Sequence, residues 1–222
     1  MSISTNIKYF QSHLPSRVRL VAVSKFHTIE TLMQAYEAGQ RIFGESRVQE
    51  LLPKYEVLPK DIEWHFIGHL QSNKVKHIAP FVSLIHGVDS YALLEEINRC
   101  GKKIGRIVPC LLQVHIAQEE TKYGFSFDEL RALLQQEKWQ ALTNISIRGL
   151  MGMASYTDNE EKIKQEFHSL SVFFKELKAT YFAADNLFCE LSMGMSGDYS
   201  LAIREGSTLI RIGSAIFGER NY

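Results

Sequence analysis

Eight short apolar runs, each followed by a stretch with helical patterning, constrain the fold of this chain most strongly. Such runs of Val, Ile, Leu and Ala are typical of strands buried on both faces, as in a parallel sheet covered by helices. Eight strand and helix units without an obvious linker predict an α/β fold and favour a (β/α)8 TIM barrel. An open doubly wound sheet is the alternative. The runs lie at residues 20–25, 41–44, 64–68, 81–85, 107–116, 146–150, 187–191 and 208–212.

The pattern predicts one domain that spans residues 1–222, because no repeat or low-complexity segment interrupts the alternation. The longest helix is expected from Asn159 to Thr180, where apolar residues recur on one face. A shorter helix begins near Arg47, and Pro53 is expected to help end it.

Composition narrows the class of partner. Twenty-five basic residues balance 25 acidic residues without a dense basic block, which argues against a nucleic-acid partner or an electrostatic membrane anchor. No apolar run is long enough to span a bilayer, and the first residues lack a signal-peptide core. Cys100, Cys110 and Cys189 are too widely spaced for a disulfide framework or a zinc motif. We therefore expect a cytoplasmic protein, taken as a monomer, that binds a small molecule.

Lys25 stands at the carboxyl end of the first run, and a helix signal begins at Thr28. A lysine at that place points into the mouth of an α/β fold. Its stem could simply cover apolar surface while its ammonium stays in water. Alternatively, an amine partly withdrawn from water loses proton affinity and can form a Schiff base with an aldehyde. Lys25 alone leaves both interpretations open.

Two glycine-rich turns follow the last two runs, at residues 192–197 and at Gly213-Ser214. In a barrel such turns lie side by side, where backbone N–H groups commonly bind a phosphate, and Ser196 and Ser214 add hydroxyl donors. Ordinary turns also favour Gly and Ser. Barrel closure would bring Lys25, Arg211 and both turns to one mouth, although Arg211 could instead form a structural ion pair.

Six segments together carry a family resemblance: VAVSK at 21–25, FGESRVQE at 43–50, WHFIGHLQSNK at 64–74, GLMGM at 149–153, LSMGMSGD at 191–198 and RIGSAIFG at 211–218. They resemble the pyridoxal-phosphate homeostasis protein family, which is similar to the N-terminal barrel domain of alanine racemase. The resemblance implies that Lys25 carries pyridoxal 5′-phosphate as an internal aldimine. It also implies that Ser196, Gly213 and Ser214 bind the phosphate and that Arg211 faces the pyridine nitrogen.

One position departs from the family pattern. Ser46 stands where the family usually has Asn after Gly-Glu. A single hydroxyl cannot reproduce the donor and acceptor pair of an amide. The polar contacts that this position makes in the family are therefore not expected in full here.

The resemblance implies a carrier that takes part in vitamin B6 homeostasis without catalytic turnover and passes its cofactor to apo-enzymes that depend on it. The alternatives are a racemase that uses the same cofactor, and a barrel enzyme that acts on a phosphorylated sugar through a Lys25 Schiff base. Alanine racemase draws a catalytic tyrosine from a second, β-rich domain, whereas this chain ends at Tyr222 soon after the eighth run. Racemisation needs two acid–base groups, and besides Lys25 only Tyr123, His65 or His86 are plausible donors.

The histidines lack the spacing of metal ligands, so no metal site is expected. Hydrogen-bonded or solvated rings are the better interpretation. His65 and His86 are candidates for the lining of the mouth.

Overall fold

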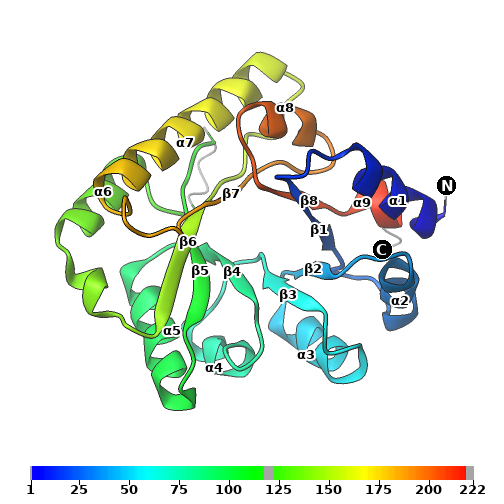
Figure 1. Cartoon of the computed structure of the whole chain (residues 1–222), viewed down its shortest axis with the longest axis horizontal. Coiled ribbons are helices and arrows are strands. Elements are labelled where there is room, and N and C mark those ends of the chain that lie inside the picture. The colour runs from blue at the N-terminus through cyan, green and yellow to red at the C-terminus, as the bar shows by residue number, and fades with distance from the viewer. Residues whose placement is uncertain (1, 118–122, 219–222) are drawn as a thin grey trace.

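The structure, a computed structural model, describes residues 2–117 and 123–218 and confirms the closed parallel barrel (Figure 1). Neighbouring strands pair in chain order, and the last strand pairs with the first, so that Val21 lies opposite Arg211. The strands are β1 (Arg19–Val23), β2 (Ile42–Glu45), β3 (Glu63–Phe66), β4 (Leu84–Val88), β5 (Val108–Gln113), β6 (Ile145–Met151), β7 (Glu190–Ser192) and β8 (Leu209–Ile212).

Helices surround the barrel on its outer side (Figure 1). Those of the described residues are α1 (Ile3–His13), α2 (Ile29–Glu37), α3 (Val48–Val57), α4 (Val75–Ile78), α5 (Tyr91–Ile104), α6 (Phe127–Gln135), α7 (Glu160–Thr180), α8 (Tyr199–Arg204) and α9 (Ser214–Phe217), with 3-10 turns η1 (Ser72–Lys74) and η2 (Lys138–Ala141). Side-chain oxygens cap several of them; Thr28, for example, accepts from the Thr31 N–H at the start of α2. None of these helices is both long and apolar enough to cross a membrane.

Alternation along the strands divides the core into two layers. Val21, Leu84, Leu111, Met151 and Leu209 form a small cluster inside the barrel. Residues of the opposite parity, such as Ala22, Phe43 and Ile210, belong to the larger cluster between the strands and the helices. The barrel interior is therefore packed with side chains, as in other barrels of this class. A binding site in such a barrel lies at one of its two ends.

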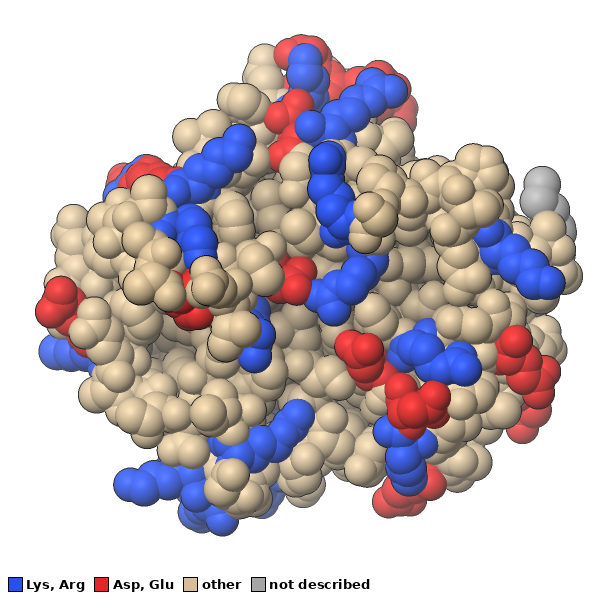
Figure 2. Space-filling model, viewed as in Figure 1, with Lys and Arg blue, Asp and Glu red and all other residues tan. Residues whose placement is uncertain are grey.

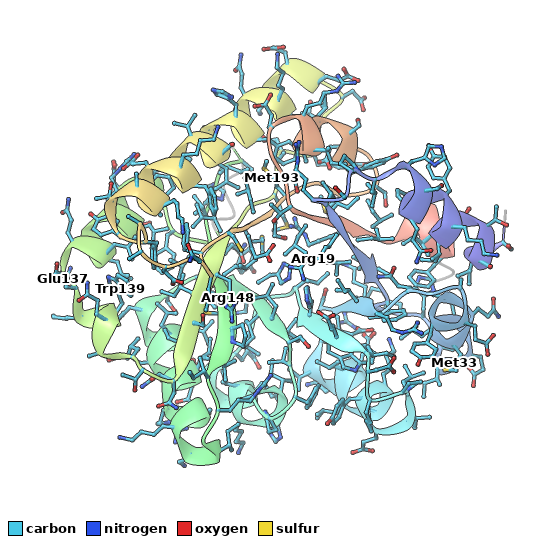
Figure 3. All side chains as sticks on the ribbon, viewed as in Figure 1. Arg19, Met33, Glu137, Trp139, Arg148 and Met193 are labelled. Atoms are coloured by element: carbon cyan, nitrogen blue, oxygen red, sulfur yellow. The ribbon has the colours of Figure 1, made fainter. Side chains whose placement is uncertain are left out.

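Charged side chains are distributed over the face seen in Figure 2 without one large area of a single sign. Arg19 and Arg148 lie near the centre of the same view in Figure 3. Arg19 is ion-paired with Glu190 of β7. Arg19, the first residue of β1, is exposed, whereas Arg148 in the middle of β6 is half-buried.

Several boundaries differ from the sequence-based expectation. The fourth strand is Leu84–Val88, not 81–85, and the seventh is Glu190–Ser192, not 187–191. Pro53 does not end its helix, because α3 continues to Val57 and buries Val48, Leu51 and Lys54 on one face. The helix α1 had not been predicted; it begins at the N-cap Ser2 and buries Ile7 and Phe10.

Candidate functional site

Lys25 lies just beyond the carboxyl end of β1, half-buried beside a hollow of about 410 Å³. This volume falls in the range of sites that bind small molecules. The carboxyl ends of neighbouring strands and their loops line the hollow, including Ser46, Gly68, His69, Gln113 and Tyr123. Catalytic and binding sites of TIM barrels lie at this end of the strands.

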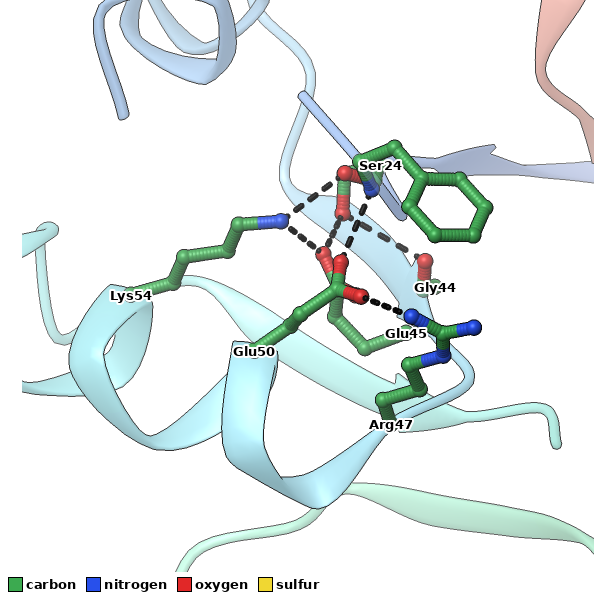
Figure 4. A network of polar contacts seen from close by, with 7 residues as sticks. Ser24, Gly44, Glu45, Arg47, Glu50 and Lys54 are labelled. Atoms are coloured by element: carbon green, nitrogen blue, oxygen red, sulfur yellow. Dashed lines mark hydrogen bonds and ion pairs between the residues drawn. The ribbon is translucent and has the colours of Figure 1, made fainter. Parts of the chain in front are cut away.

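The backbone before Lys25 is held by a buried polar network (Figure 4). The Ser24 hydroxyl donates to Glu45 Oε1 at 2.6 Å, and Lys54 Nζ donates to the same oxygen at 2.6 Å and to the Ser24 carbonyl at 2.9 Å. Glu45 and Lys54 are almost inaccessible to solvent. A buried ion pair adds little net stability, but it fixes the groups that it contacts, here the Ser24 carbonyl. Ser24 is therefore fixed relative to β2 and α3.

Burial raises the pKa of the Glu45 carboxyl, and Lys54 opposes that shift. The second oxygen, Oε2, is buried without a hydrogen-bond partner among the described residues. Glu45 therefore depends on Lys54 and Ser24 for compensation of its charge.

The backbone after Lys25 makes a tight turn. The His27 N–H donates to the Ser24 carbonyl at 3.1 Å, and Phe26 has φ +69°, while Lys25 does not have a positive φ. A four-residue turn with a positive φ only at its third residue is a type II turn, and glycine is the preferred residue there. Phe26 is held in it by Glu50 Oε2, which accepts its N–H at 2.8 Å.

The glycine-rich turns meet as the sequence predicted for a barrel. Ser196 Oγ accepts from the Gly213 N–H at 3.4 Å, and a Cβ added to Gly213 would lie 3.5 Å from Val23 Cβ. Asp198 fixes the first turn by accepting the Met195 N–H. Ser214 is exposed at the start of α9.

These turns leave backbone donors free. Within residues 2–117 and 123–218, the N–H groups of Ser196, Gly197, Ser214 and Ala215 have no hydrogen-bond acceptor. Free donors at two turns that contact each other, together with two hydroxyls, fit an anionic group such as a phosphate.

Arg211 projects from β8 into the barrel and is almost completely buried. Its Nη1 donates to Ser192 Oγ at 2.6 Å and its Nη2 donates to the Gly152 carbonyl at 3.0 Å. The ion pair with a glutamate that was considered from the sequence does not form among the described residues. Burial lowers the pKa of Arg211 to about 10, and because this value is still well above 7 the side chain is cationic at neutral pH. Both acceptors of Arg211 are uncharged, and its remaining N–H groups can donate to a ligand atom.

A chain of hydrogen bonds continues from Arg211 across the barrel interior. Ser192 Oγ lies 2.9 Å from His86 Nδ1, and His86 Nε2 lies 3.0 Å from His65 Nδ1. Because an arginine only donates, Ser192 accepts from it and can use its own hydrogen on His86, which then donates to His65. The tautomers of the two rings are therefore coupled, because the nitrogen that carries the proton on His86 determines which nitrogen carries it on His65.

Both histidines are uncharged in this chain of hydrogen bonds. Burial lowers the pKa of His65 to about 3, with a smaller effect of the Arg19 charge. Burial also lowers the pKa of His86, and His65, Arg211 and Arg19 add to the shift. The expectation that these rings line the mouth is wrong: they are 2% and 0% exposed, inside the barrel. Strand alternation alone could have placed them there, since His65 and His86 occupy inward positions.

The predicted residues therefore form two adjacent groups at one end of the barrel. Lys25 lines the hollow over β2 to β5, whereas Ser196, Arg211, Gly213 and Ser214 are not part of its lining. The β1–β8 pairing links the groups, since Val23 contacts the Gly213 turn two residues before Lys25. An amine, a set of free N–H donors and a buried cation fit the aldehyde, the phosphate and the ring nitrogen of pyridoxal 5′-phosphate.

Comparison with known proteins extends over the whole barrel. A family model described as the N-terminal domain of alanine racemase matches residues 1–221. The pyridoxal phosphate homeostasis protein of Aquifex aeolicus is 40% identical over 205 residues, which cover 92% of this chain and 88% of the relative. That of Homo sapiens is 38% identical over 215 residues, which cover 92% and 77%.

Two solved structures have a fold similar to that of this chain. PipY of Synechococcus elongatus, determined with PLP bound, superposes with a TM-score of 0.87 at 38% identity and covers 98% of this chain and 100% of its own. Alanine racemase of Bartonella henselae superposes with a TM-score of 0.72 at 18% identity, over 99% of this chain and 60% of its own. At that identity the second match reports the fold alone.

Proposed function

Because this chain belongs to the family of pyridoxal phosphate homeostasis proteins, built on the N-terminal domain of alanine racemase, we propose that it binds pyridoxal 5′-phosphate covalently through Lys25. It takes part in intracellular vitamin B6 homeostasis without catalytic turnover of its own. The observation that carries the proposal is the position of Lys25, at the barrel mouth, beside a hollow and next to a group of free N–H donors.

Each residue of the site has a separate role. Lys25 would hold the cofactor through its amine, whose condensation with the aldehyde carbon would release one water molecule. Ser196 and Ser214 would hold the phosphate through their hydroxyls and free N–H groups, while Gly213, whose N–H donates to Ser196 Oγ, would let the backbone of its turn approach the phosphate closely. Arg211 would donate to the ring nitrogen and, as a cation, would disfavour protonation of that nitrogen. When bound, the cofactor supplies an electron sink, which an unprotonated ring nitrogen weakens.

The acid–base groups of the site support a carrier rather than a racemase. A racemase needs a second proton donor opposite the lysine. Of the three candidates, His65 and His86 are buried, uncharged and bonded to each other, and only Tyr123 lines the hollow. The two histidines are therefore poorly placed to exchange protons with an amino acid in the hollow.

We further propose that the protein is one domain, acts as a monomer in the cytoplasm, and delivers its cofactor to apo-enzymes. A single closed barrel built from all eight strands supports one domain. The three cysteines are unpaired, which suits a reducing compartment. Light scattering of the purified protein measures the monomer, and reactivation of an apo-enzyme by the loaded protein measures delivery.

Spectroscopy with chemical trapping tests the proposal directly. The loaded protein should absorb visible light, and borohydride should fix the cofactor to Lys25, as mapped by mass spectrometry. Lys25→Ala should lose both signals while Lys8→Ala, a control on the exposed face of α1, keeps them. Labelling of another lysine would refute the assignment, and a colourless protein would favour a cofactor-free sugar enzyme. Deuterium exchange at the α-carbon of amino acids, dependent on Lys25, would instead indicate a racemase.

A further inference from the structure

The turn that presents Lys25 has an unfavourable residue at its third position. Phe26 has φ +69°, a conformation that costs energy for any residue with a Cβ and that glycine adopts freely. The turn must therefore be stabilised by contacts from outside it. Two contacts of this kind come from the start of α3.

Glu50 makes the contact that the backbone needs. Its Oε2 accepts the Phe26 N–H at 2.8 Å, and its Oε1 lies 3.5 Å from Arg47 Nη1 (Figure 4). The Arg47 guanidinium in turn lies 4.8 Å from the centre of the Phe26 ring. The backbone and the ring of Phe26 are thus both held from α3, by a carboxylate and by the cation that pairs with it.

A change at Phe26 would be transmitted to Lys25. On one side, Ser24 is fixed by Glu45 and Lys54. On the other side, α2 is anchored in the core through Leu32 and Ala35. Since both flanks are fixed, any relaxation of residue 26 must be absorbed by the torsions of the short segment between them. Lys25 lies in that segment, so the direction of its side chain would change.

We propose that Glu50 is a positioning residue for Lys25: by holding Phe26 in the left-handed conformation, it fixes the turn that directs the Lys25 amine into the hollow. The inference rests on the proposed function, in which Lys25 is the residue that binds the cofactor covalently. It assigns Glu50 no contact with the cofactor. Its effect is on how fast the Lys25 adduct forms.

The test measures formation of the adduct over time. The full chain is mixed with pyridoxal 5′-phosphate, quenched with borohydride at intervals, and the labelled Lys25 peptide is quantified by mass spectrometry. Glu50→Ala should slow labelling by about fivefold to tenfold, the effect expected for loss of one hydrogen bond. Glu50→Gln, which keeps an acceptor oxygen, should stay within about twofold of wild type. Glu56→Ala, an exposed glutamate on the same helix, is the matched control and should label as wild type.

Repeating the Glu50→Ala substitution in a Phe26→Gly variant distinguishes support of the turn from a general loss of stability. In Phe26→Gly the turn no longer needs support, so adding Glu50→Ala should change the labelling rate by less than about twofold. Circular dichroism of each variant monitors the fold. An equal loss from Glu50→Ala in both backgrounds, or wild-type labelling of Glu50→Ala, would overturn the proposal while leaving Lys25 as the attachment residue. Absence of Lys25 labelling in the wild-type protein would overturn the proposed function and this inference with it.

Discussion

Acid should destabilise this protein through the two histidines inside the barrel. In the folded chain, burial lowers the pKa of His65 from 6.5 to about 3, so the folded state keeps the ring neutral while the unfolded state binds a proton below pH 6.5. Stability from this group is therefore complete above pH 6.5 and is lost progressively as the pH falls toward 3.

The size of the effect follows from the shift. Each proton taken up by the unfolded state alone costs about 1.4 kcal/mol per pH unit, so His65 should remove about 2 kcal/mol between pH 7 and pH 5. His86 shifts in the same direction and adds to the slope. A loss of this size is a large fraction of the stability of an ordinary domain.

Urea unfolding followed by circular dichroism at several pH values measures the slope. At pH 5, His65→Asn should show a slope lower than wild type by about 1.4 kcal/mol per pH unit, because one group no longer takes up a proton on unfolding. The comparison uses slopes, so a constant loss of stability in the variant does not affect it. His77→Asn, in which the same substitution is made at an exposed residue of α4, is the matched control. Equal slopes in His65→Asn and wild type would refute the reasoning.

Two further perturbations address the site and the fold. Ser196→Ala and Ser214→Ala should each weaken cofactor binding by about 1.5–3 kcal/mol in calorimetry, since each loses a hydrogen bond to a charged group while the backbone donors remain; wild-type affinity in both and in the double variant would place the phosphate elsewhere. Gly149→Ala should strongly lower the melting temperature, because φ is +147° and the added Cβ would lie 1.8 Å from a backbone oxygen of β7; an unchanged melting temperature would contradict this.

The architecture could be predicted because buried strands must be apolar whatever their neighbours are. The boundaries of these strands could not be predicted in the same way. Residues 81–85 are nearly all apolar, but Phe81 and Val82 belong to the turn after α4, where Val82 is buried as fully as a strand residue. Hydrophobicity reports burial, and burial does not distinguish a strand from a packed turn.

Some features of the site could likewise be predicted from the sequence, and others could not. Lys25 and the glycine-rich turns were predictable because a strand end and a turn are local features. The hydrogen bonds of Arg211, Ser192, His86 and His65 were not, because they depend on which strands face each other across the barrel. Glu50 lies within a recognised motif, but its partner, the Phe26 N–H, is 24 residues away. Only the folded chain reveals that pairing.

The pairing of the first strand with the last has a consequence for biosynthesis. Strand β1 has both of its neighbours only after Arg19 to Ala22 have paired with Leu209 to Ile212 of β8. The side chain of Asn6 in α1 also donates to the Ile216 carbonyl of α9. Contacts so distant in sequence form late and slowly. On the ribosome, β1 therefore remains half-paired until residues 209–212 have emerged. The residues proposed to hold the phosphate lie in the turns before and after β8, so the cofactor cannot be loaded before β8 has been made and has paired with β1.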